Sequence, residues 1–193
     1  SPIEVFDSKG GYSLPGTLVR TEGSQPCGVL DADNCYGWAD QFRQFLLEVV
    51  GRNGIDGSGM KMSHTVRYNM NNAYWNGRMV FGVGDNVIFV TFATPDIYGH
   101  EVGHGETEYH GNGKFVYRNQ PGALNEHLSD VRGETFEMWL KKTKAADHDW
   151  VVGNGIFVPG INGVGIRHML LPGTAYNDKK LGKDPQPAKM SDY

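Results

Sequence analysis

The sequence is short of cysteine and of positive charge, and it contains no long hydrophobic run. Two of its 193 residues are cysteines, and 18 Lys and Arg stand against 22 Asp and Glu, which gives a formal net charge of −4. This balance offers no basic surface for nucleic acid or for an anionic membrane. The longest apolar runs, such as Phe45–Leu47 and Val87–Val90, are far shorter than the roughly 20 residues that span a bilayer.

What is present is typical of a globular protein. Hydrophobic residues make up 39% of the chain and charged residues 21%, which excludes a disordered tail or a coiled coil and predicts one domain or two small ones. The 27 glycines are spread along the chain, which indicates many turns. Cys27 and Cys35 enclose a short segment. Their spacing favours a small disulfide loop in an oxidising compartment, with two free thiols as the alternative.

The first half of the chain is predicted to be β-rich with one helix. Apolar residues recur at helical spacing and Gly51 follows them, which predicts a helix over about residues 38–51. The stripe consists of Trp38, Phe42, Phe45, Leu46, Val49 and Val50. Segments rich in β-branched and aromatic residues, separated by glycine turns, predict strands over 65–68, 78–81 and 87–92. We therefore expect an α+β fold, with a β-rich region over 1–94, helices over 95–145 and a turn-rich segment over 146–193.

The chemistry is concentrated in the sequence His100-Glu101-Val102-Gly103-His104. Asp96 is a candidate N-cap for a helix from Ile97 to about His104, with Gly105 after it. On a helix, residues four apart share one face, so both imidazoles can reach one cation while Glu101 lies beside it. This arrangement is typical of zinc hydrolases, and the alternative is a surface helix with solvated histidines.

A catalytic zinc ion takes three protein ligands, so a third ligand is needed from elsewhere in the chain. A second helix is predicted over 122–142, and it carries Glu126, Asp130 and Glu137 near one face. Leu124 and Leu128 accompany them, and carboxylates on a face that buries hydrophobic residues indicate nearby cations. The alternative is a solvated acidic edge.

Three blocks of the sequence, in this order, resemble the thermolysin-like family of zinc metalloendopeptidases. They are residues 71–77 (NNAYWNG), the His100–His104 motif, and residues 122–126 (GALNE) followed by Ser129-Asp130. The resemblance covers most of the chain and implies a secreted, zincin-like enzyme that cleaves polypeptides. It implies His100, His104 and Glu126 as the zinc ligands. Asp130 would orient His100, and Glu101 would take the proton of the attacking water and pass it to the leaving amine.

The resemblance also implies how a substrate is held. Asn72 and the Ala73 backbone would pair with an extended substrate along an edge strand. Tyr117 matches a tyrosine that stabilises the oxyanion, and Arg167 matches an arginine that binds a substrate carbonyl. A pocket for a hydrophobic residue after the scissile bond would be formed by Ile97, Val152, Ile156 and Ile166, although isolated aliphatic residues are more often part of a core.

Calcium is a weaker implication of the resemblance. Asp96, Glu137 and Asp149 match ligands of a paired calcium site in the family, and Asn154 stands where another carboxylate is frequent. Since that charge is lost, we expect one calcium ion or none.

Family members continue into a mostly helical second domain, and the chain ends at Tyr193, where that domain would begin. We therefore expect the C-terminal helical domain to be missing. Either the chain is a fragment whose partner is a second, C-terminal chain, or it is a shortened homologue. A non-catalytic binding module stabilised by metal is the rival to a peptidase, and zinc hydrolysis of another substrate class is a third alternative.

Overall fold

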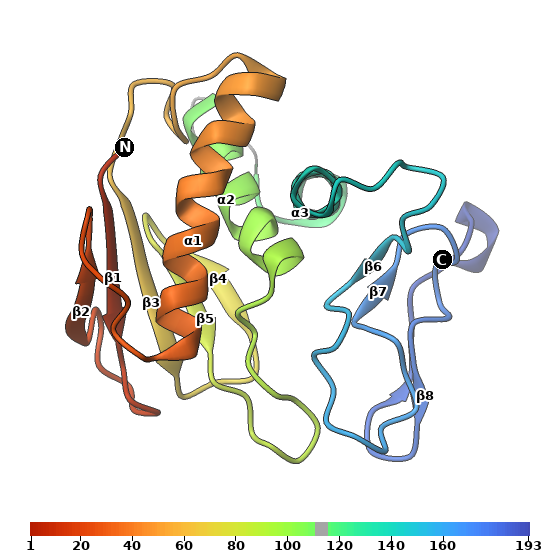
Figure 1. Cartoon of the computed structure of the whole chain (residues 1–193). Helices are drawn as coiled ribbons and strands as arrows, with labels where there is room; N and C mark the ends of the chain where they lie inside the picture. Colours follow the sequence, from red (N-terminus) through yellow and green to blue (C-terminus); the bar gives the residue numbers. More distant parts are fainter. Residues whose placement is uncertain (111–115) are drawn as a thin grey trace.

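The computed structural model describes residues 1–110 and 116–193, and its first half is built around a mixed five-stranded sheet. The strands are β1 Ile3–Asp7, β2 Thr17–Thr21, β3 Met62–Tyr68, β4 Ala73–Trp75 and β5 Met79–Gly82. They lie in the order β2-β1-β3-β5-β4. The inner pairs β1–β3 and β3–β5 are parallel, whereas β2 and β4 pair antiparallel to their neighbours. The strand β4 is therefore at one edge of the sheet (Figure 1).

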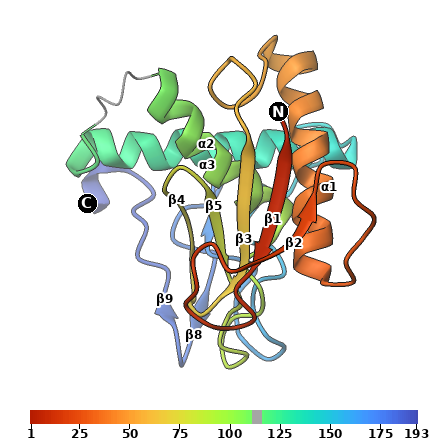
Figure 2. The same cartoon turned by 90° about the vertical axis from the view of Figure 1, so that its left-hand side faces the viewer.

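Three helices form the other layers of the fold. They are α1 Leu30–Phe45, which continues as the π-helical turn η1 Leu46–Val50, then α2 Pro95–His110 and α3 Asn119–Lys141. Helices α1 and α2 lie next to each other against the sheet, and α3 packs against α2 on the side away from the sheet (Figure 1); Figure 2 shows α3 along its length. The predicted β-rich region and the two later helices are therefore found in the expected order.

Tyr98 of α2 is the point where the layers meet. Its buried ring packs against Phe42 of α1, Phe81 of β5 and Phe136 of α3, at centroid distances of 6.0, 5.9 and 6.1 Å. Its hydroxyl lies 2.9 Å from Nε2 of the buried His64 on β3. One aromatic side chain thus joins α1, α3 and the sheet, and this fixes α2 over the sheet.

Helix α2 is longer than predicted, since it passes Gly105 and ends at His110. A Cβ atom at Gly105 would lie 2.9 Å from the indole of Trp75, and one at Gly99 would lie 2.8 Å from Cα of Gly133 on α3. These glycines allow close approach of neighbouring elements and do not end the helix. The packing offsets the roughly 1 kcal/mol that each glycine costs in a helix interior.

Helix α1 begins at Leu30, eight residues before the predicted start. The carboxylate of Asp33 accepts hydrogen bonds from the backbone N–H groups of Cys27 and Gly28, at 3.0 and 2.9 Å. Residues 30–33, which precede the predicted helix, therefore form its first turn. The end at Gly51 is as predicted, but Val49 and Val50 are exposed, because the wider π-helical turn moves them out of the apolar stripe.

Two other expectations are wrong. Residues 87–92 form no strand beyond one isolated bridge from Phe89 to Phe157. The carboxylate of Asp85 instead accepts backbone N–H bonds from residues 87, 88 and 89, which curls this segment into a turn. Cys27 and Cys35 are free thiols. Cys35 of α1 is buried in the core, whereas Cys27 is only partly buried.

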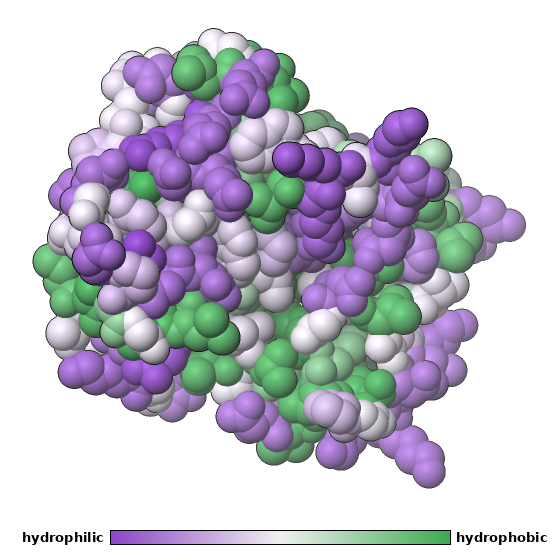
Figure 3. All heavy atoms as spheres, viewed as in Figure 1, coloured by the Kyte–Doolittle hydropathy of each residue, from purple (hydrophilic) through white to green (hydrophobic). Residues whose placement is uncertain are grey.

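After α3 the chain forms only short elements, as predicted. Strand β6 Val151–Val152 pairs with β7 Arg167–His168, β8 Asn177–Asp178 pairs with β9 Gly182–Lys183, and the 3-10 turn η2 Met190–Asp192 follows. Hydrophobic residues gather on the lower part of the face shown in Figure 3. None of the described helices is long and apolar enough to cross a membrane.

Candidate metal centre and cleft

The two histidines of the motif lie on one face of α2 and point to a common position. Their Nε2 atoms are 3.0 Å apart. From α3, Oε2 of Glu126 lies 3.2 Å from Nε2 of His100 and 3.6 Å from Nε2 of His104. A tetrahedral zinc ion with bonds of about 2.0–2.1 Å separates its ligand atoms by about 3.3 Å. The three predicted ligands therefore have the spacing that a zinc ion requires.

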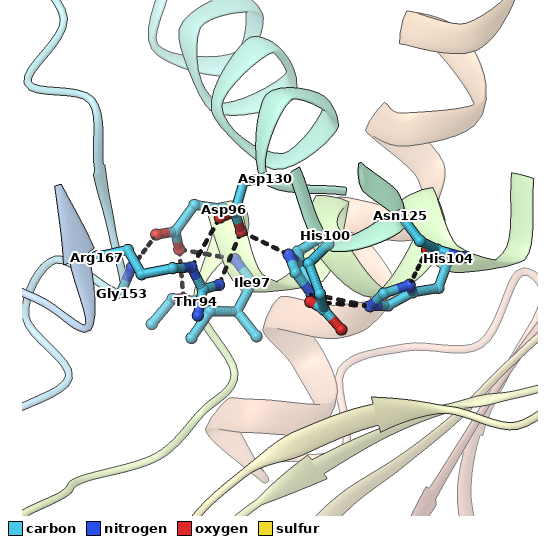
Figure 4. Close-up of polar contacts among 10 residues, drawn as sticks. Thr94, Asp96, Ile97, His100, His104, Asn125, Asp130, Gly153 and Arg167 are labelled. Carbon is cyan, nitrogen blue, oxygen red and sulfur yellow. Dashed lines mark hydrogen bonds and ion pairs between the residues drawn. The ribbon is translucent and has the colours of Figure 1, made fainter. Parts of the chain in front are cut away.

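The other ring nitrogen of each histidine is held by a side chain of α3. Nδ1 of His100 lies 2.7 Å from Oδ1 of Asp130, and Nδ1 of His104 lies 2.7 Å from Oδ1 of Asn125 (Figure 4). When these Nδ1–H groups donate, both Nε2 atoms present a lone pair to the metal position. Asp130 was predicted in this place. Asn125 was missed, although each ligating histidine needs such an acceptor.

Arg167 of β7 is fixed by Asp130. Its Nε and Nη2 donate to the two carboxylate oxygens of Asp130, each at 2.7 Å. Burial would raise the pKa of Asp130, but hydrogen bonds from His100 and Arg167 and the Arg167 charge lower it. The carboxylate thus stays ionised between its two partners and joins the metal centre to the segment after α3.

Glu101 lies beside the histidines in a dry position. Glu101 is 4% exposed, and its Oε2 atom has no hydrogen-bond partner among the described residues. Burial raises the pKa of the carboxyl to about 7, while His100 and His104 lower it and Glu126 raises it. A carboxyl group with a pKa near neutrality can both accept and release a proton.

A cavity of about 480 Å³ opens over these groups. Asn72 and Ala73 at the β4 edge, Tyr117, Arg167 and the predicted pocket residues Ile97 and Ile166 are on its wall. The other two predicted pocket residues, Val152 and Ile156, are buried in the core, at 1% and 0% exposure. The Tyr117 side chain is 61% exposed, with its ring centroid 5.9 Å from that of His104.

The leucines that were expected to be buried beside the carboxylates of α3 are exposed. Leu124 and Leu128 are exposed, whereas Asp130 and Glu137 are buried and Glu126 is half-exposed. The carboxylates are therefore held by interactions with α2 and with the segment after α3, and not by burial beside these leucines.

The four residues expected to bind calcium lie close to one another, where α3 meets the start of α2 and the segment after α3, and calcium binding there stays a prediction. The Asp96 carboxylate accepts hydrogen bonds from the Thr94 hydroxyl and from the backbone N–H groups of Ile97 and Gly153, at 2.5, 2.8 and 2.5 Å (Figure 4). Asn154 donates its amide to Asp149 at 2.6 Å. Glu137 and Asp149 also lie together with Glu134 and His148, two residues that the sequence interpretation did not include.

Comparison with protein families gives two adjoining matches. Residues 6–108 match the model "Thermolysin metallopeptidase, catalytic domain", and residues 113–193 match "Thermolysin metallopeptidase, alpha-helical domain". The expectation that the chain contains none of the helical domain is therefore wrong. Residues 113–193, which include α3, match the model of that domain.

Similar proteins share this organisation over part of their length. Protease PrtS of Photorhabdus sp. (strain Az29) is 45% identical over 98% of this chain and 52% of its own length, and an extracellular metalloprotease of Pectobacterium carotovorum subsp. carotovorum is 39% identical over 98% and 55%. The solved precursor of protealysin, a metalloproteinase from Serratia proteamaculans, superposes with a TM-score of 0.94 at 41% identity, covering 100% of this chain and 60% of that one. The chain thus spans about half the length of the curated relatives it matches.

Proposed function

Because the chain belongs to the thermolysin metallopeptidase family, we propose that it is a zinc-dependent endopeptidase that cleaves polypeptides before hydrophobic residues. The observation that supports this most directly is the convergence of His100, His104 and Glu126, with donor atoms 3.0–3.6 Å apart. When bound there, zinc would lower the pKa of a water ligand towards about 7 and polarise the scissile carbonyl. Asp130 and Asn125 hold the two imidazoles in the tautomer that this requires.

Glu101 is the general base. It lies one residue after His100, and burial places its pKa at about 7, so it is able to take a proton from the attacking water and to release it to the leaving amine. Oε2 is without a protein partner among the described residues. It is therefore free to bond to the water and then to the amine.

The substrate lies along β4 as an additional strand. Because β4 is at the edge of the sheet, its outer backbone groups can pair with an extended chain, and Asn72 and Ala73 supply this contact. Ile97 and Ile166 on the cavity wall favour a hydrophobic side chain after the scissile bond. Tyr117 and Arg167 lie on the same wall and donate to the oxyanion and to a substrate carbonyl.

The proposed place of action is extracellular. One similar protein is named an extracellular metalloprotease, and its similarity to this chain supports the same location. The free cysteines give no support of their own, because they do not form the disulfide that was expected.

Metal content and peptide cleavage test this function together. We expect one zinc ion per chain at the His100–His104 centre and cleavage of an unstructured polypeptide on the amino side of aliphatic or aromatic residues. Removal of zinc by a chelator should abolish cleavage, and added zinc should restore it. Purified protein that binds no zinc would contradict the proposal, and so would cleavage that is unchanged after the zinc has been removed.

A further inference from the structure

The end of the cleft beyond His104 carries a carboxylate that the proposed function does not use. The cavity wall there is formed by Thr107 and Glu108 of α2 and by Tyr74 and Trp75 of β4. None of these four side chains has a role in holding the metal or in moving a proton. They form a polar and aromatic wall, in contrast to the aliphatic wall at the other end of the cavity.

Trp75 holds the Glu108 side chain in place. Its Nε1 donates a hydrogen bond to Oε2 of Glu108, at 2.6 Å. The indole itself is packed against α2, since a Cβ atom at Gly105 would lie 2.9 Å from it. Glu108 is exposed and lies on the cavity wall, and a carboxylate that accepts one bond has further acceptor positions. The Glu108 carboxylate is therefore positioned to accept a bond from a molecule in the cleft.

This end of the cleft has an excess of negative charge. Among the described residues of the cavity wall, Arg167 is the one Lys or Arg side chain, and it donates both of its bonding nitrogens to Asp130. Glu126 belongs to the metal centre and Glu101 is the proposed base. Glu108 is the remaining carboxylate of the wall, and a cleft lined by one sign of charge attracts the opposite sign. A basic group fits this end of the cleft.

The order of residues along α2 shows which part of a substrate meets Glu108. At a rise of 1.5 Å per residue, Glu108 lies about 16 Å beyond Ile97 along the helix, with His100 and His104 between them. The proposed function places the scissile bond at the two histidines and the residue after that bond against Ile97. Glu108 then lies on the other side of the bond. It faces the residues that precede the bond.

The geometry of an extended chain selects one of these residues. Successive side chains of a strand point to opposite sides, so the second residue before the bond shares a side with the residue after the bond. Glu108 lies six residues after Val102, the middle of the motif, which is about 9 Å along the helix. Two residues of extended chain cover about 7 Å. A long basic side chain spans the remaining distance.

We propose that Glu108, with Trp75 beside it, forms a subsite for the basic side chain of the second residue before the scissile bond. The ammonium or guanidinium group pairs with the Glu108 carboxylate, and the aliphatic stem packs on the indole of Trp75. The inference rests on the proposed function for the direction of the substrate. It adds a preference on the amino side of the bond to the hydrophobic preference on the carboxyl side.

Peptide binding without turnover tests the subsite. Zinc-loaded protein with Glu101→Gln is titrated with fluorescently labelled peptides that share a hydrophobic residue after the bond and carry Lys, Gln or Glu at the second residue before it. Fluorescence anisotropy gives the Kd of each peptide. We expect the Lys peptide to bind about two- to fivefold more tightly than the Gln peptide, and the Glu peptide more weakly by a similar factor. High salt should reduce both differences.

Variants in the same background assign the preference to Glu108. Glu108→Gln keeps an acceptor for the Trp75 indole and removes the charge, so the Kd values for the Lys and Glu peptides should become nearly equal. Glu108→Lys should invert their order. Glu48→Gln removes an exposed glutamate outside the cavity wall and should keep the parent ratio. A peptide of the same composition, with its Lys on the carboxyl side of the bond, shows whether the position of the charge matters.

Four results would overturn the subsite. They are equal Kd values for the Lys and Glu peptides, a ratio that survives Glu108→Gln, equal binding wherever the Lys is placed, and failure to bind any of the peptides. Cleavage of the same peptides by the parent protein is measured separately. Lys-selective binding without cleavage would contradict the peptidase and support the subsite, whereas cleavage without selectivity would do the reverse.

Discussion

Nδ1 of His104 lies 2.7 Å from Oδ1 of Asn125, a residue of α3 that directly precedes the third predicted zinc ligand. The same helix holds the other histidine, since Oδ1 of Asp130 lies 2.7 Å from Nδ1 of His100. Helix α3 therefore supplies one ligand and both orienting acceptors. The metal centre depends on how closely α3 packs against α2.

Removal of the Asn125 acceptor should weaken zinc binding. In an Asn125→Ala variant the His104 ring loses the hydrogen bond that fixes its orientation, and we expect zinc affinity to fall by about 10–100-fold. Competition with a chromophoric chelator measures this. Gln120→Ala, which removes an exposed amide from the same helix, is the control and should keep the parent affinity. Equal affinities for the two variants would show that Asn125 does not orient His104.

Replacement of the base should separate metal binding from turnover. Glu101→Gln keeps the size of the side chain but cannot accept the water proton, so we expect kcat/KM for a hydrophobic peptide to fall by about 10²–10⁴-fold or more. The zinc content should remain one per chain. Steady-state cleavage and metal analysis on the same sample give both values. A variant as active as the parent would rule out Glu101 as the base.

The contact between α2 and α3 should not tolerate a methyl group at Gly133. A Cβ atom there would overlap the backbone carbonyl of Asp96, and neither helix can move without disturbing the metal centre. We expect Gly133→Ala to lower the free energy of unfolding by about 1–3 kcal/mol. Gly37→Ala in α1 is the control, because a Cβ atom there meets nothing within 4 Å. Gly37→Ala should raise the free energy of unfolding by about 0.5–1 kcal/mol. Urea unfolding of both variants and of the parent measures these changes.

The stability of the metal-free protein should fall as the pH rises. Burial raises the pKa of Glu134 in the folded state to about 9, from the ordinary glutamate value of 4.5 that applies in the unfolded state. Between these values the folded state keeps a proton that the unfolded state has lost. The unfolding free energy then decreases by up to about 1.4 kcal/mol per pH unit from this group. The full contribution is present below about pH 4.5 and is lost as the pH approaches 9.

Denaturant unfolding at several pH values, in the presence of a chelator, measures this slope. Glu134→Gln cannot lose a proton, so its stability should depend less steeply on pH over the same range. If the two slopes are identical, Glu134 is ionised in the folded protein and its assigned protonation is wrong.

The sequence by itself predicted the three residues that converge at the candidate metal centre and the order of the elements. His100 and His104 are four residues apart on one helix, so local geometry alone places them on one face. The α+β order and the end of the continuous α1–η1 helix at Gly51 were predictable for the same reason, because helical periodicity and a left-handed glycine are local signals.

Only the tertiary structure decided which side chains support those ligands and which groups stand apart from them. The partnership of Asn125 with His104 depends on the contact between α2 and α3, which glycine residues permit. The grouping of His148 with Glu134 joins residues 14 positions apart after a turn that has no periodic pattern. Asp85 curls residues 87–89 into a turn although their composition favours a strand. The first two contacts are non-local and leave no local pattern in the sequence, and at Asp85 side-chain hydrogen bonds outweigh the local strand propensity.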